Sequence, residues 1–186
     1  MATVNVTPQE FNFVSYDAAV VERIAEKLVR DVGLGDATVD IEIDEKTPLG
    51  RQRIESVDDP VKLFVEGGAF EDPTEPRHLT ERGTADVLGR LLFRVADRRS
   101  GRFDDAPADT DMSLQESVAW DAYCMGRLER LGYDVRKPRR QYHFRTRHGF
   151  NDVADAVFER LWSADELTWA DVAAACAETE AIRQPA

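Results

Sequence analysis

One stretch, residues 38–44, constrains the fold more than any other. It reads Thr-Val-Asp-Ile-Glu-Ile-Asp, with an apolar residue at every second position and acidic residues between them. Successive side chains of a β-strand point to opposite faces, so this period of two is typical of a strand with one buried and one solvated face. The pattern predicts a half-buried strand with an acidic outer face.

Two further strands are predicted directly after it, at residues 52–57 and 61–65. The turn residues Asp58-Asp59-Pro60 separate them, and the connections between the three segments are short. Short connections favour antiparallel neighbours, so we expect a three-strand antiparallel meander. Residues 1–14 alternate weakly and are expected to form an edge strand or an ordered arm.

Helical spacing of apolar residues predicts about five helices, at residues 15–32, 80–98, 113–131, 151–162 and 168–182. Ser113 and Glu116 have the spacing of a capping box, which marks the start of the third helix. Residues 99–112 have loop composition and are interpreted as a mobile acidic loop. The fold class is therefore α+β, with residues 1–186 forming a single domain whose small antiparallel sheet packs against the helices.

Composition and charge narrow the class of protein. The chain has 186 residues and a net charge of −12, and 42% of its residues are hydrophobic, which is typical of a soluble globular protein. It has no apolar run of the length that a membrane span needs and no signal-peptide pattern, so we expect a cytoplasmic protein. Cys124 and Cys176 form no motif and are interpreted as buried free thiols. The excess of Arg over Lys is typical of a GC-rich bacterial genome.

Residues 133–150 stand out from this acidic background and are called the basic island. Six basic side chains occur here against one acidic residue, Asp134, and two of the three histidines of the chain are also present. Tyr133 and Val135, and again Tyr142 and Phe144, alternate with polar residues on either side of Lys137-Pro138. We interpret the island as a β-hairpin with an aromatic inner side and a basic outer side.

The basic island is the strongest functional signal, and we expect a non-enzymatic binding protein that needs no cofactor. The partner would be an acidic protein surface or a phosphate-like anion; nucleic acid is disfavoured by the net charge of −12. The alternative is that the hairpin is docked on acidic residues of the chain itself, at residues 38–44 or 104–111. The expected contact residues are Arg136, Arg139, Arg140, Tyr142, His143, Arg145 and Arg147.

An enzyme is the rival hypothesis. The chain contains none of the common nucleotide-binding, serine-hydrolase or H-E-x-x-H metallopeptidase signatures. His143, His148 and Asp152 lie within ten residues of one another and are the candidate ligands of a divalent metal, and His143 is the candidate general base. Either arrangement would suit a hydrolase or a nuclease-like enzyme.

The predicted order of one helix, three strands and a second helix resembles the opening of small zincin-like metallopeptidases. The resemblance covers about residues 15–98 and rests on the order of elements. In that family the helix after the sheet carries H-E-x-x-H, whereas here it reads Thr-Glu-Arg-Gly-Thr-Ala-Asp-Val-Leu-Gly-Arg-Leu-Leu-Phe, residues 80–93. The resemblance therefore implies a scaffold without the zinc ligands, kept for binding.

Overall fold

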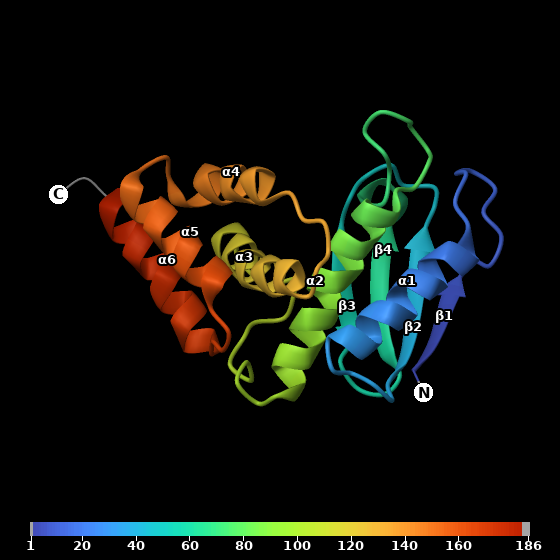
Figure 1. The fold of residues 1–186 in the computed structure, drawn as a ribbon, viewed down its shortest axis with the longest axis horizontal. Coiled ribbons are helices and arrows are strands. Elements are labelled where there is room, and N and C mark those ends of the chain that lie inside the picture. The colour runs from blue at the N-terminus through green and yellow to red at the C-terminus, as the bar shows by residue number, and fades with distance from the viewer. Residues whose placement is uncertain (1, 184–186) are drawn as a thin grey trace. The chain divides into compact units, whose positions relative to one another are not determined.

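The computed structural model describes residues 2–183, which form two compact units divided after Arg99. Within these residues there are six α-helices, one short 3-10 turn and a four-stranded sheet (Figure 1), which confirms the α+β class. The expectation of a single domain stays a prediction. Across residues 2–183, no helix is both long and apolar enough to cross a membrane.

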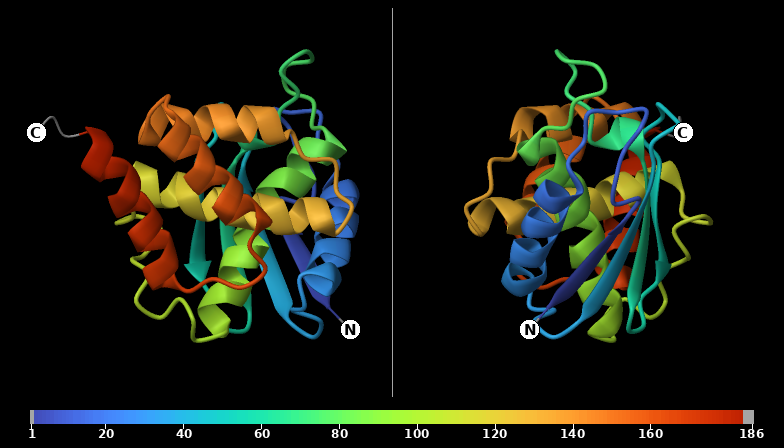
Figure 2. Two further views of the ribbon diagram at one scale, coloured as in Figure 1. Left: turned by 60° about the vertical axis from the view of Figure 1, so that its left-hand side comes forward. Right: turned by 90° about the vertical axis from the view of Figure 1, so that its right-hand side faces the viewer.

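The first unit contains the whole sheet and two helices. Its elements are β1 (Thr3–Thr7), α1 (Ala18–Asp31), β2 (Thr38–Asp44), β3 (Gln52–Ser56), β4 (Val61–Glu66) and α2 (Glu81–Arg99). In Figure 2, α1 and α2 lie on one face of the sheet, and the two helices contact each other. The alternation of β2 is confirmed, because Val39, Ile41 and Ile43 are buried while Glu42 on the other face is exposed.

The predicted antiparallel meander is wrong in its pairing. The strand order is β1-β2-β4-β3: β1 and β4 run parallel to β2, and β3 pairs antiparallel with β4 at the edge. The apolar strand β4, with Val61, Leu63 and Val65 buried, takes the interior position beside β2. The more polar β3 lies at the edge of the sheet, where a strand has a neighbour on one side and solvent on the other. The parallel pair of β1 and β2 is joined across α1, the connection that parallel strands require.

The second unit is helical. It contains α3 (Leu114–Arg130), α4 (Lys137–His148), α5 (Asp152–Ser163) and α6 (Trp169–Arg183). The predicted capping box is present at α3, where the Ser113 hydroxyl accepts from the Glu116 amide and the Glu116 carboxylate accepts from the Ser113 amide. Residues 100–112 form no helix or strand, and Phe103 from this stretch is buried, with its ring stacked at 4.8 Å on Trp120.

The predicted hairpin in the basic island is also wrong, because residues 137–148 form helix α4. Pro138, which we interpreted as a turn residue, lies in the first helical turn, where its missing N–H costs no hydrogen bond. Phe144 and His148 are four residues apart and both buried, so the apolar face follows the helical period. Gly149 ends the helix with φ of 111°, a conformation that favours glycine.

Candidate functional site

Helix α4 has an inner face that is packed into the second unit. His148 is fully buried and its ring stacks on Phe144 with 3.9 Å between the ring centroids. Its Nδ1 lies 2.7 Å from the Thr179 hydroxyl and its Nε2 lies 3.0 Å from the Gln115 carbonyl oxygen. Both ring nitrogens are therefore engaged in hydrogen bonds within this unit.

Two basic side chains of the island also belong to the inner face. Arg145 donates from Nε and Nη2 to the two carboxylate oxygens of Asp155 on α5, each at 2.6 Å. Lys137 Nζ lies 2.7 Å from the Glu159 carboxylate, one turn further along α5. The hydrogen bonds from Arg145 hold the pKa of Asp155 below its ordinary value, and the same pairing raises the pKa of Arg145. These two cations bind acids of the chain itself, although at α5 rather than at residues 38–44 or 104–111.

The outer face of α4 carries three of the four remaining basic residues together with exposed aromatic rings. We define this outer face by six residues, Arg136, Arg139, Tyr142, His143, Arg147 and Phe150, all of which are exposed. Tyr142 and Phe150 retain 58% and 65% of their accessible surface, and their rings meet edge to face at 5.8 Å. Large aromatic side chains with so much exposed surface are typical of contact surfaces when they occur beside arginine.

Arg136 and Arg139 are the least neutralised cations of this face. Within residues 2–183, neither guanidinium makes an ion pair or a side-chain hydrogen bond. Both lie at the start of α4, whose first turn holds no acidic residue. The helix dipole places partial positive charge at this end, so each cation there is unfavourable by about 0.3–1 kcal/mol, and an acidic partner would relieve this.

Arg140 and His143 lie at the border between α4 and α3. Together with Asp121, Val118 and Ala122 of α3 they line a small pocket of about 20 Å³. Arg140 is half-buried, whereas Arg139 beside it is exposed. Arg140 is therefore not counted in the outer face, and its predicted role as a contact residue stays a prediction.

The three candidate metal ligands are not brought together. His143 is exposed on α4, whereas His148 is buried with both ring nitrogens in hydrogen bonds. Asp152 lies in the first turn of α5. Among residues 2–183, no group of three His, Cys, Asp or Glu side chains is arranged to hold a metal ion.

Phe150 lies beside the predicted contact residue Tyr142, and sequence reasoning missed it. It follows Gly149, beyond the end of α4, so no strand or helix period in the sequence indicates that its ring meets the ring of Tyr142. Comparison of the chain with protein-family models, with curated proteins and with solved structures finds no match. The resemblance to zincin-like metallopeptidases accordingly stays a prediction.

Proposed function

We propose that this chain is a non-enzymatic binding protein that contacts an acidic surface of another protein through the outer face of α4. The observation that carries the proposal is the combination of two exposed arginines that make no ion pair within residues 2–183, Arg136 and Arg139, with the exposed ring pair of Tyr142 and Phe150. Arginine and aromatic residues are the side chains that contribute most to binding energy at protein interfaces. The cytoplasmic location predicted from the sequence is part of this proposal.

The partner is expected to be acidic because of the local charge at the start of α4. Within residues 2–183, Arg136 and Arg139 make no ion pair, so they favour an acidic group and select against basic groups, since like charges at an interface are costly. The net charge of −12 repels an acidic partner from the rest of the chain. The acidic remainder of the molecule would orient the partner toward α4.

The test compares charge reversal on the two faces of α4. Arg136→Glu combined with Arg139→Glu should weaken binding of a fluorescent acidic peptide containing apolar residues by about tenfold or more. Because an acidic group at a helix start is favourable, the thermal midpoint should stay unchanged or rise slightly. Arg30→Glu with Arg51→Glu is the matched control, since both arginines are exposed in the first unit and the charge change is identical.

Binding should be measured by fluorescence anisotropy at low and at physiological salt, with single- and double-stranded oligonucleotides as the second probe. Peptide binding that is lost only in the α4 variant supports the proposal. Steeply salt-dependent binding of the oligonucleotides alone would instead show that phosphate is the preferred anion. A peptide affinity that the α4 variant and the control reduce equally would refute the assignment to this face.

A further inference from the structure

The first unit contains a pocket at the edge of the sheet where three parallel strands end. The loops that follow β1, β2 and β4 all contribute to it, through Phe13, Val14 and Tyr16, through residues 45–48, and through Gly67, Gly68, Glu71 and Arg77. Its volume is about 200 Å³. In open sheets with parallel strands, the crevice outside the carboxyl ends of the strands is where ligands bind. The pocket is thus placed where the topology favours a ligand.

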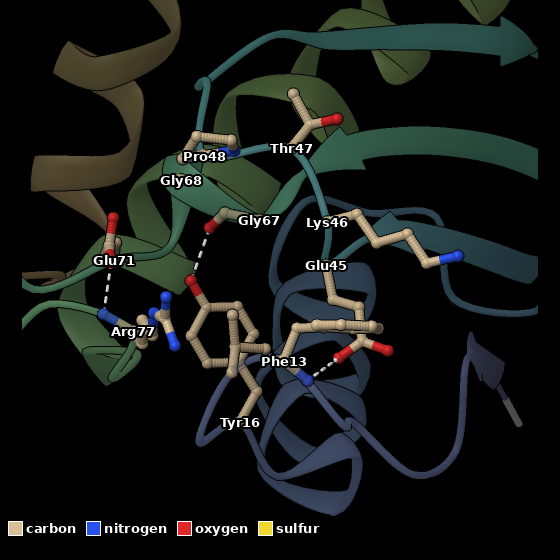
Figure 3. A pocket seen from close by; sticks show the side chains of 11 residues that line it. Phe13, Tyr16, Glu45, Lys46, Thr47, Pro48, Gly67, Gly68, Glu71 and Arg77 are labelled. Atoms are coloured by element: carbon tan, nitrogen blue, oxygen red, sulfur yellow. Dashed lines mark hydrogen bonds between the residues drawn. The ribbon is translucent and has the colours of Figure 1, made fainter.

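Hydrogen bonds and close packing fix the walls of this pocket (Figure 3). The Tyr16 hydroxyl donates to the Gly67 carbonyl oxygen at 2.5 Å, which ties the loop after β1 to the loop after β4. Gly68 packs so closely on the loop after β2 that a Cβ atom there would overlap the carbonyl oxygen of Pro48. Because these contacts link all three loops, the pocket does not depend on a ligand for its shape.

The two acidic residues of the pocket bind its own backbone. One carboxylate oxygen of Glu45 accepts from the amides of Asn12 and Phe13, each at 2.7 Å. The Glu71 carboxylate accepts from the amide of Arg77. Both acids therefore have a structural role in holding the loops.

Arg77 is held in an unusual conformation. Its φ of 67° lies in the left-handed region that non-glycine residues rarely adopt. The Glu71 carboxylate fixes its amide, and its carbonyl oxygen accepts from the amide of Ser15 at 2.8 Å. Figure 3 shows its side chain extending toward Tyr16, and among the described residues its guanidinium has no hydrogen bond or ion pair. Strained residues of this kind cluster at ligand sites.

We propose that this pocket binds a small organic carboxylate. The Arg77 guanidinium presents a planar fork of N–H donors that matches the two oxygens of a carboxylate. Lys46, whose ammonium lies over the Phe13 ring at 5.8 Å, also lines the pocket. The rings of Phe13 and Tyr16 and the side chain of Pro48 provide apolar surface for the body of the ligand. This site is separate from the outer face of α4 and does not rest on the function proposed for it.

The test uses benzoate and its uncharged analogue benzamide as probes, followed by chemical-shift changes in NMR spectra of the full chain. Benzoate is expected to bind weakly, in the millimolar range, and to shift the amides of the three loops, whereas benzamide is expected to cause no such shifts. Arg77→Asn removes the guanidinium and keeps a residue that tolerates a positive φ. It should weaken benzoate binding by about ten- to hundredfold, the loss expected for charge-assisted hydrogen bonds.

Two further variants make the result decisive. Arg77→Lys keeps the charge but loses the fork, so its affinity should fall between those of the wild type and Arg77→Asn. The variant with Arg136→Glu and Arg139→Glu should bind benzoate like the wild type, which separates this site from α4. Equal binding of benzamide, full binding by Arg77→Asn, or no binding of benzoate by a folded wild type would each overturn the proposal. A clear fall in the thermal midpoint of Arg77→Asn would show that Arg77 has a structural role instead.

Discussion

Replacement of His148 by leucine would show whether this histidine belongs to the fold or to a metal site. The ring is fully buried and its two nitrogens contact Thr179 and Gln115. A carbonyl oxygen only accepts, so Nε2 carries a hydrogen, and in the neutral ring the Thr179 hydroxyl donates to Nδ1. Leucine fills most of the volume and removes both hydrogen bonds.

The expected cost follows from the fate of the two former partners. The Thr179 hydroxyl lies 2.9 Å from the Cys176 carbonyl oxygen and can donate there instead. Gln115 lies in the first turn of α3, so its carbonyl oxygen keeps the bond from the helix backbone. Neither group is left without a partner, and the loss of two neutral hydrogen bonds amounts to about 1–3 kcal/mol. A larger loss would require a stranded polar group, which the geometry does not create.

Tryptophan fluorescence during urea unfolding measures the loss in free energy of unfolding caused by His148→Leu, and it reports on the second unit, where His148 lies. The chain has three tryptophans, at positions 120, 162 and 169, and all three lie in the second unit. His143→Leu, on the exposed side of the same helix, is the matched control and should change the free energy of unfolding by less than about 0.5 kcal/mol. A similarly small effect of His148→Leu would refute the reasoning. Zinc that stabilises the wild type and not the variant would support a metal site instead.

Two other predictions test the packing of each unit. A Cβ added at Gly126 would overlap the Trp162 carbonyl oxygen and lie 2.7 Å from its carbonyl carbon, so Gly126→Ala must separate α3 from α5. It should cost about 3 kcal/mol or more by the same fluorescence assay, and a variant as stable as the wild type would contradict this close approach. In the first unit, burial, with a smaller contribution from Glu71, raises the pKa of Tyr16 from 10.0 to about 12. The neutral phenol is thus favoured in the folded state, so its stabilising contribution is complete below pH 10 and is lost as the pH rises to about 12. The unfolding midpoint followed by circular dichroism should fall more steeply over this range for the wild type than for Tyr16→Phe, and parallel profiles would show that the phenol does not contribute.

The sequence was sufficient to locate most elements because their ends carry local signals. The capping residues Ser113 and Asn151 start helices at the predicted places, and the alternation of residues 38–44 identifies β2. Strand pairing has no comparable signal. Nothing local to β3 indicates that β4 separates it from β2, because strand order depends on which strand buries most apolar surface within the assembled sheet.

The basic island shows why the type of an element can be misjudged. Tyr142 and Phe144 alternate as in a strand, while Phe144 and His148 have the spacing of a helix, so both periods fit the same short segment. The long side chains of Arg145 and Lys137 add to the ambiguity, because they lie on the inner face although their charge suggests an exposed position. The packed and the exposed residues of the island can be told apart only by the side of helix α4 on which each one lies.

The side of α4 on which a residue lies decides whether its substitution tests binding. Arg139 and Arg145 have the same charge and lie six residues apart, so composition treats them as equal members of one basic site. In the structure Arg145 is bound to Asp155, whereas Arg139 is exposed beside Tyr142. Reversal of Arg145 would place two acids together and weaken the contact between α4 and α5, so any loss of binding would be indirect. Reversal of Arg139 leaves that contact intact and therefore tests binding directly.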